Sequence, residues 1–500
     1  MRLITLLLTV YSISEAAKIL VYSPIFGHSH TKYLASIAEI LTEEKHDVTV
    51  LMPIVDESER EKHCLKKVTK RIFVEADKDV ARLMADKNSM MAKVWTSNQG
   101  NPLELLDMAK NMSRLFAGSC SNLMQQTDLL NQLKAEKFDL GIVEPFSQCG
   151  LAVFHVIGLK NYVSALSSIR FDHVSQAVGE PTASSFVPGT MSVFSDQMTL
   201  KQRLLNTIQT FELNAHSIFV FPSTIPFLDF PAPTISKVVP IGGISVNAKK
   251  AANKLPEKWD KVLNERKQTV FISFGSNAKS VGMPAEFKKS LIELFASLPD
   301  VTFIWKYEDE KDTLVDHLPN VHLGSWLPQT DLLADERLSL FITHGGLGST
   351  MELATLGKAS IVIPLFADQY RNANMLSRHG GALALAKEDL AKHRVLKATI
   401  ENILSDKSYS ENAEKLANVL QNQPTNARET LLKHIEFAAK FGQQPHTDPY
   451  GRKLSFWQYY LIDALLLVVF VLSFVLFVIY KVTKLVLSTV CRIRSKSKLE

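Results

Sequence analysis

This sequence is poor in cysteine and in an excess of one charge, and each shortage excludes a class of protein. Four cysteines among 500 residues form neither a disulfide framework nor a zinc-binding spacing. The net charge of +5 is modest and the basic residues are dispersed, so the sequence does not predict nucleic-acid binding. What it does hold is 46% hydrophobic residues, enough for sizeable cores in two or three domains.

One of the few long apolar runs lies at the start of the chain. Arg2 is followed by the run Leu3–Val10 and then by small residues around Ser14–Ala16, a pattern typical of a secretory signal peptide. We therefore predict a signal peptide over residues 1–16. A first buried strand is the alternative interpretation of the same run.

The other apolar run lies near the end of the chain, over residues 461–480, and only Asp463 interrupts it. At about 1.5 Å per residue such a helix crosses the ~30 Å hydrocarbon core of a bilayer, so we predict a transmembrane helix. Aromatic side chains that favour the headgroup zone precede it: Trp457, Tyr459 and Tyr460. Residues 481–500 form a basic tail, which the positive-inside rule places in the cytosol.

The tail also carries targeting information. Its last five residues, KSKLE, resemble the K-x-K-x-x retrieval signal of endoplasmic-reticulum membrane proteins, although a plain basic flank is the alternative. Together these patterns predict a single-pass type I protein of the endoplasmic-reticulum membrane with its large domains in the lumen. The sequon at Asn111 would then face the lumen and accept a glycan. Cys491 lies beyond the apolar run, which leaves three cysteines before it, with their pairing open.

Between the two ends, strand-like runs alternate with helical patterns in two blocks. The strands predicted in the first block are Ile19–Ser23, Val48–Pro53 and Leu140–Glu144, with a helix over Lys32–Lys45. Those predicted in the second block are Thr269–Gly275, Val301–Lys306, Leu338–Thr343 and Ser360–Phe366, with a helix over Ala285–Ser297. Such alternation predicts an α/β fold with doubly wound parallel sheets. A polar stretch over 246–268 separates the blocks, so we predict domains at 17–245 and 246–445.

The most informative segment is Phe341–Gln369, FITHGGLGSTMELATLGKASIVIPLFADQ. A buried strand leads into the glycines of GGLG, where missing side chains let backbone N–H groups approach a ligand. The helix that we predict to begin at Ser349 directs its unpaired N–H groups and positive dipole end at this turn, which suits a diphosphate. His344 at the strand end supplies a further hydrogen-bond donor. The segment predicts a site for a nucleotide diphosphate that carries a sugar.

Polar side chains follow at spacings that extend this site. Ser349 and Glu352 share one helix face, so a hydroxyl can meet phosphate while a carboxylate binds a ribose diol. The next strand ends before Asp368 and Gln369, and in open parallel sheets ligands collect at such carboxyl ends. Each residue also has a plainer interpretation. Ser349 and Glu352 fit a capping box, Asp368 fits a helix cap, and His344 fits an ordinary core histidine.

A dinucleotide site is a competing interpretation of the glycine turn. Gly346 and Gly348 lie between a strand and a helix, and Asp368 follows at about the distance of a ribose-binding acid. However, Met351 occupies the third glycine position, where close helix packing requires a small residue. We therefore do not favour a dehydrogenase.

The segment from Trp326 to Gln369, which begins WLPQTDLLA and ends PLFADQ, resembles the UDP-glycosyltransferases, most closely the membrane-bound UDP-glucuronosyltransferases of animals. SFVPGTMSVFSDQMTLKQR, at Ser185–Arg203, also resembles the acceptor-domain segment of that family, so the resemblance covers essentially the whole chain. It implies the GT-B architecture, in which two Rossmann-like domains face each other across a cleft, followed here by the transmembrane helix. It also implies that no cofactor is needed, because the UDP-sugar is a co-substrate.

The resemblance implies a role for each polar residue of the donor site. Trp326 would stack on uracil and Gln329 would contact the base. The diphosphate would be held by His344, Gly346 and Ser349, the ribose hydroxyls by Glu352, and the sugar by Asp368 and Gln369. In one departure from the family, relatives commonly carry asparagine where this chain has Gly348.

The reaction of that family also needs a base, because an acceptor hydroxyl attacks the anomeric carbon while UDP leaves. A positioned base contributes roughly 10²–10⁴-fold, and histidine suits the task. The first strand is followed by His28 and His30, and the resemblance favours His30, whose distance to KHDVTVL at 45–51 matches the base of the family. Glu144 would orient it, where vertebrate relatives have the shorter aspartate; a surface acid at the strand end is the alternative.

Two further residues extend the donor site by resemblance. Ser276 ends FISFGS and would approach the diphosphate, unless it serves only the turn; Lys306 would lie near the nucleotide, unless it is a solvated lysine. A metal-dependent transferase would need an acidic D-x-D pair. Asp77-Lys78-Asp79 spells one within a charged helical stretch, which we interpret as a solvated face, so we predict no metal.

These patterns predict an inverting transferase that moves glucuronic acid or glucose from its UDP-sugar to a hydroxyl or carboxyl of small lipophilic acceptors, in the manner of detoxification enzymes. Glucuronate needs a cation for its carboxylate, and Arg371 is the nearby candidate. The alternative is a nucleotide-sugar-binding membrane protein without turnover. The expected partners are the UDP-sugar, the acceptor and the bilayer, with a homo-oligomer left open.

Overall fold

The computed structural model describes residues 16–85, 93–96, 102–169, 172–181, 183–190, 192–209, 217, 219–246 and 255–496. The predicted signal peptide, apart from its last residue, and residues 497–500 of the tail lie outside this range. The chain forms two compact units, Met1–Thr447 and Asp448–Glu500.

The first unit contains two parallel sheets of six strands each. The strands of the first sheet are β1 (Lys18–Tyr22), β2 (Asp47–Pro53), β3 (Lys70–Val74), β4 (Leu140–Val143), β5 (Tyr162–Leu166) and β6 (Val220–Pro222). They lie in the order β3-β2-β1-β4-β5-β6. The central strands are apolar on both faces and buried throughout, as in β4, because helices cover both sides of a doubly wound sheet.

The second sheet repeats this arrangement. Its strands are β7 (Gln268–Ser273), β8 (Val301–Lys306), β9 (Val321–Gly324), β10 (Leu338–Thr343), β11 (Ser360–Val362) and β12 (Ala382–Ala384). They lie in the order β12-β11-β10-β7-β8-β9, so both sheets place their first strand beside their fourth. At that point the strand order reverses, and open α/β sheets bind ligands outside the carboxyl ends of the strands there.

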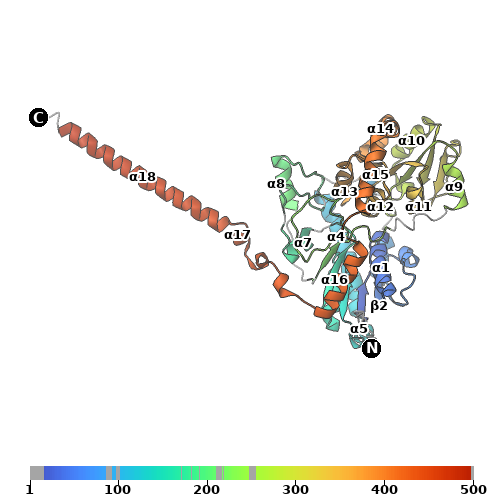
Figure 1. Cartoon of the computed structure of the whole chain (residues 1–500), viewed down its shortest axis with the longest axis horizontal. Helices are drawn as coiled ribbons and strands as arrows, with labels where there is room; N and C mark the ends of the chain where they lie inside the picture. Colours follow the sequence, from blue (N-terminus) through green and yellow to red (C-terminus); the bar gives the residue numbers. More distant parts are fainter. Residues whose placement is uncertain are drawn as a thin grey trace, which may run out of the picture. The chain divides into compact units, whose positions relative to one another are not determined.

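Helices cover the faces of both sheets (Figure 1). Those from the first block are α1 (His28–Glu43), α2 (Lys78–Ala85), α4 (Pro102–Met124), α5 (Thr127–Ala135), α6 (Cys149–Ile157), α7 (Asp172–Val178) and α8 (Leu200–Gln209). Those that follow are α9 (Glu257–Leu263), α10 (Ala285–Ala296), α11 (Gln329–Ala334), α12 (Leu347–Leu356), α13 (Gln369–Ser377), α14 (His393–Ser405), α15 (Ser408–Gln421) and α16 (Ala427–Phe441).

Two segments cross from one block to the core of the other. Helix α16 follows the second block in sequence, yet its buried Leu431, Ile435 and Ala438 belong to the core of the first sheet, and Figure 1 shows this orange helix among blue and green elements. In the opposite direction, Val94 and Trp95 lie in the core of the second sheet. The α16 segment falls within 246–445, so the predicted second domain contains a helix that packs on the first.

The elements agree closely with those predicted from the sequence, and the differences have local causes. β8 and β10 have the predicted bounds. β11 ends at Val362 rather than Phe366, because Pro364 lacks the N–H that a further ladder bond would need. Helix α1 begins at His28 instead of Lys32, which places His30 in its first turn.

The second unit is helical. A short helix, α17 (Phe456–Tyr459), precedes α18 (Ile462–Lys496), and within α18 the segment Ile462–Thr489 is long and apolar enough to cross a membrane. This agrees with the span predicted over 461–480. Figure 1 shows α18 as the long red helix at the end of the chain.

Candidate functional site

The predicted site residues gather at the carboxyl ends of the strands where each sheet reverses its order. In the first sheet, His30 lies in the turn of helix that follows β1, and Glu144 comes directly after β4. In the second, Ser276 lies in the turn after β7, and His344 follows β10. Both sheets therefore place their candidate residues at the equivalent point of the same topology.

His30, Glu144 and Ser167 form one hydrogen-bonded group at the end of the first sheet. His30 Nδ1 lies 2.8 Å from Glu144 Oε2 and 2.9 Å from Ser167 Oγ. The backbone N–H of Ser167 donates to the other carboxylate oxygen, Glu144 Oε1, at 2.8 Å. Glu144 is 4% exposed, so it is not the solvated surface acid that the sequence left as an alternative.

The charges of this group stabilise one another. Burial opposes a positive charge on His30, but the Glu144 carboxylate outweighs it and raises the pKa of His30 above its ordinary 6.5. Burial likewise opposes the Glu144 charge, yet His30 and the bonds from Ser167 hold the pKa of Glu144 below its ordinary 4.5. A carboxylate can only accept, so Nδ1 of His30 carries the proton and Nε2 of the neutral ring carries the lone pair. The arrangement is that of an oriented general base.

Aromatic rings lie around the His30 imidazole. Phe26 and Phe146 lie 4.5 and 5.2 Å from the His30 ring, between centroids. Phe116 contacts both of them, at 4.9 and 5.4 Å. Phe146 is 40% exposed, so an apolar surface lies open beside the imidazole.

His344 lies in a cradle that only glycine can form. A Cβ atom on Gly275 would approach the His344 ring to 2.6 Å, and one on Gly346 would approach it to 2.7 Å. Burial, with a smaller contribution from Lys306, lowers the pKa of His344 to about 4. At neutral pH the ring is therefore an uncharged hydrogen-bond donor beside the N-terminus of α12.

Helix α12 begins at Leu347, with Gly346 as its N-cap. Gly345 has φ of +79°, a conformation that favours glycine, and it turns the chain sharply from β10 into the helix. The predicted start at Ser349 is therefore wrong, and so is the capping-box alternative, because Ser349 and Glu352 both lie inside the helix. The turn and the helix N-terminus form the anion-binding geometry that the glycines predicted.

Glu352 is the centre of a polar group on α12. Gln329 Nε2 donates to Glu352 Oε2 at 2.6 Å and to Ser349 Oγ at 3.0 Å. Thr330 Oγ1 donates to Glu352 Oε1 at 2.7 Å, and Lys32 Nζ from the first block lies 3.6 Å from the same oxygen. The structure thus brings the predicted ribose and base ligands together, and adds two residues.

Trp326 lies on the adjacent loop and is 57% exposed. Its indole meets the ring of His28 edge to face at 5.5 Å, and Lys62 Nζ lies 5.9 Å from the indole centroid. A flat exposed ring of this kind suits stacking against a base.

Asp368 and Gln369 lie at the end of the strand next to His344. Gln369 is 3% exposed, and its Oε1 accepts from the N–H groups of Leu365 and Phe366, so this oxygen shapes the turn. Asp368 occupies the N-cap position of α13, but its side chain makes no cap bond and accepts from Asn372 Nδ2 at 3.1 Å instead. Burial raises the pKa of Asp368, and its negative charge contributes to the raised pKa of His30 in the first block.

Two predicted cations are already engaged. Lys306 is 8% exposed, donates to the carbonyl of Gly275 at 3.0 Å and pairs with Glu308 at 2.8 Å. It therefore supports the turn before Ser276 and is not solvated. Arg371 pairs with Asp229 at 2.7 Å, with both side chains buried, so it is not a free partner for a glucuronate carboxylate.

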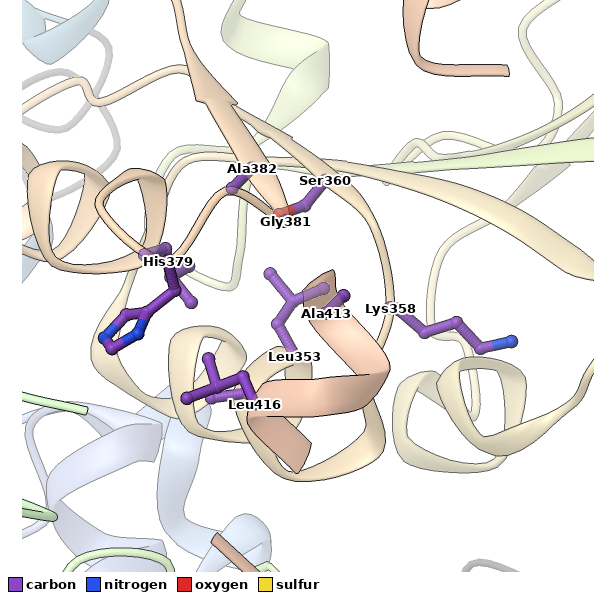
Figure 2. A pocket seen from close by; sticks show the side chains of 10 residues that line it. Leu353, Lys358, Ser360, His379, Gly381, Ala382, Ala413 and Leu416 are labelled. Carbon is purple, nitrogen blue, oxygen red and sulfur yellow. The ribbon is translucent and has the colours of Figure 1, made fainter. Parts of the chain in front are cut away.

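Two other features lie apart from this site. The cavity in Figure 2 is lined mainly by apolar residues, including Leu353 and Leu416, and it adjoins the amino-terminal ends of β11 and β12, opposite to the site. Asp77 of the D-x-D pair caps α2 by accepting from Val80 N at 2.7 Å. Among the described residues, no three His, Cys, Asp or Glu side chains gather as a metal site requires.

The model of a family described as UDP-glucoronosyl and UDP-glucosyl transferase matches residues 17–224 and 212–498, which together span almost the whole chain. The chain belongs to this family. Similar proteins include ugt-55 of Caenorhabditis elegans, 30% identical over 84% of this chain and 86% of that protein. Human UDP-glucuronosyltransferase 1A10 is 27% identical over 94% of this chain and 92% of its own length. Human 2-hydroxyacylsphingosine 1-beta-galactosyltransferase is 26% identical over 99% of this chain and 93% of its own length.

Among solved structures, Phytolacca americana UGT2, complexed with UDP-2fluoro-glucose and pterostilbene, aligns with a TM-score of 0.57. The alignment covers 84% of this chain and 99% of that chain at 18% identity, and so supports the two-sheet GT-B fold alone. The chain is thus a UDP-glycosyltransferase with two Rossmann-like sheets and one C-terminal apolar helix.

Sequence reasoning missed several residues of this UDP-glycosyltransferase. Ser167, Thr330 and Asn372 hold predicted site residues in place, Phe146 contacts the His30 ring, and Phe116 contacts Phe146. Ser167 follows β5, a strand that is not among those predicted from the sequence. Its position at the carboxyl end of a strand was therefore not apparent. Thr330 lies next to Gln329 within the segment WLPQTDLLA, so the sequence signal that identified Gln329 could also have identified Thr330.

Proposed function

We propose that this UDP-glycosyltransferase is an inverting enzyme that moves glucose or glucuronic acid onto a hydroxyl or carboxyl of small lipophilic acceptors, with His30 as the base. The observation that carries this proposal is the His30–Glu144 pair, which leaves Nε2 as the basic nitrogen. Among the described residues Nε2 has no hydrogen-bond partner of its own, and apolar rings border the imidazole.

Nε2 of His30 takes the acceptor proton as the acceptor oxygen forms its bond to the anomeric carbon, and the bond from that carbon to the UDP oxygen breaks. Glu144 stabilises the imidazolium that results. The departing diphosphate is stabilised by the N–H groups at the start of α12 and by a neutral His344. The residue roles are those expected from the family: Trp326 and Gln329 for the base, Ser276, Gly346 and Ser349 for the diphosphate, Glu352 for the ribose, and Asp368 and Gln369 for the sugar.

The contacts of Arg371 favour the uncharged sugar. Binding a glucuronate carboxylate through this residue would break its buried ion pair with Asp229, and breaking such a pair costs roughly 3–5 kcal/mol. Relatives are named for glucuronic acid and for galactose, so family membership does not fix the sugar. Glucose is therefore our preferred donor sugar and glucuronic acid the second candidate.

The proposed location is the endoplasmic-reticulum membrane, with both sheets in the lumen and α18 as the anchor. A disulfide between Cys120 and Cys149 supports an oxidising compartment, while Cys64 is free. Asn111 lies exposed on α4, where it is open to glycosylation. An endoglycosidase should increase the gel mobility of the wild type and leave Asn111→Gln unchanged; no shift in the wild type would contradict luminal glycosylation at this site.

The direct test is a competition assay on microsomes that contain the full-length protein. UDP-glucuronic acid and UDP-glucose are supplied together with a pool of phenols, and product masses are compared with a His30→Ala control. We expect a hexose increment that disappears in the control. A hexuronic-acid increment would identify the second candidate sugar, whereas UDP binding without any conjugate would favour the alternative of a nucleotide-sugar-binding protein without turnover.

A further inference from the structure

Ser167 touches both members of the base pair. It follows β5, the neighbour of β4, so its backbone lies beside the strand end that carries Glu144. Its N–H donates to Glu144 Oε1 at 2.8 Å, and its hydroxyl lies 2.9 Å from His30 Nδ1. Ser167 also helps to hold the pKa of Glu144 below its ordinary 4.5, although burial and His30 have larger effects on it.

These contacts limit the conformational freedom of Glu144. Glutamate has one more rotatable bond than aspartate, so its carboxylate adopts more positions and fixes an imidazole less firmly. Here one carboxylate oxygen is held by His30 and the other by the backbone N–H of Ser167, which leaves the longer side chain in one orientation. The Ser167 hydroxyl meets the His30 ring itself, at Nδ1. We propose that Ser167 is a positioning residue: its backbone N–H locks Glu144 and its hydroxyl holds the Nδ1 side of His30, which together set the orientation of the imidazole. This inference rests on the proposed function of His30 as the base.

The first test is Ser167→Ala, which removes the hydroxyl and keeps the backbone N–H. We expect kcat to fall about tenfold, the loss typical of one well-placed hydrogen bond, while donor KM stays unchanged. Because Glu144 holds the pKa of His30 up, a looser pair should also move the acid limb of the kcat profile to lower pH. Ser167→Thr keeps a hydroxyl and should restore most of the activity.

The matched control is Ser168→Ala. Ser168 is the next residue and is also half-buried, but its hydroxyl donates to the carbonyl of Ile169 at 3.0 Å. We expect this variant to keep the wild-type kcat and acid limb. Equal losses in the two alanine variants, or a wild-type kcat in Ser167→Ala, would overturn the inference.

A double-mutant cycle tests the mechanism itself. The Ser167 hydroxyl and the Glu144 carboxylate meet the same atom, Nδ1 of His30, so the losses caused by Ser167→Ala and Glu144→Asp should not simply add. Independent, additive losses would contradict a positioning role. His30→Ala in the same preparation separates the two hypotheses: if it keeps full activity, the proposed base is wrong, whereas if it is inactive and Ser167→Ala is normal, only this inference fails.

Discussion

The two sheets share one strand order, yet they assemble their chemistry in different ways. The proposed donor side of the second sheet comes from one continuous segment, Trp326–Gln369, with small additions from Gly275 and Lys306. The proposed base on the first sheet combines His30, Glu144 and Ser167, which are far apart in the sequence.

The difference follows from what each side must bind. A diphosphate is bound largely by backbone N–H groups, and these are arranged by consecutive residues of a turn and a helix. A general base needs side chains that approach from different directions, and a parallel sheet supplies them from the ends of separate strands. The comparison predicts that the two sides can be disabled independently, one through kcat and the other through donor binding.

The largest effect should come from His30→Ala. Without the base, kcat should fall by roughly 10²–10⁴-fold, while the affinity for UDP stays the same because the donor side is intact. Turnover kinetics and calorimetric titration with UDP measure the two quantities. A variant that lost both equally would show that the two sides are not independent.

On the donor side, Gly346→Ala should have the largest effect. The new Cβ would lie 2.7 Å from His344 Nε2, and such overpacking costs about 1–3 kcal/mol, which should raise donor KM and lower the melting temperature. Gly348→Ala is the matched control, since a Cβ there meets nothing within 4 Å. Identical behaviour of the two variants would refute the cradle around His344.

Glu352→Ala should weaken the donor more moderately. It removes the acceptor of Gln329 and Thr330 as well as the proposed ribose ligand, so we expect donor KM to rise about tenfold, or ~1.4 kcal/mol, with less change in kcat. Thr330→Val removes only one of these hydrogen bonds and should have a smaller effect. A normal donor KM in Glu352→Ala would indicate that the carboxylate only holds Gln329 and Thr330 and does not bind the donor.

The acid limb of the pH profile tests the base pair more finely. His30 must be neutral to accept a proton, and because its pKa is raised, kcat should increase with pH through a value above 6.5. In Glu144→Gln the charge is gone and burial remains, so the residual activity should have its acid limb below 6.5. If the acid limb lies at the same pH in the wild type and in Glu144→Gln, the limb does not report the ionisation of His30.

The smallest effect is expected at Gly348, the position where relatives commonly carry asparagine. Because space is open at this position, Gly348→Asn should fold normally and could supply the side chain that relatives carry. We expect a donor KM a few-fold lower, since one exposed hydrogen bond contributes about 0.5–1.5 kcal/mol. An unchanged KM would indicate that the backbone already fills this role.

These differences also explain how far the sequence alone could predict the protein. The central strands were predicted because each is a short apolar run, and β8 and β10 have the predicted ends. The donor site was predicted because its residues are consecutive. Ser167, Phe116 and Phe146 could not be found in this way, since nothing local to them indicates that they contact His30 or the rings beside it. The engagement of Arg371 was equally hidden, because Asp229 lies far away in the sequence.

The Cys120–Cys149 disulfide gives the acceptor side a sensitivity that the donor side lacks. It joins α4, one turn after Phe116, to the first residue of α6, shortly after Phe146. It therefore connects the segments that carry two contacting rings, of which Phe146 also contacts His30. The second sheet, from 268 to 384, contains no cysteine. A mild reductant that opens this disulfide should therefore loosen only the proposed acceptor surface, and UDP should still bind. Extracts prepared with thiols would then understate turnover in an enzyme whose donor site is intact.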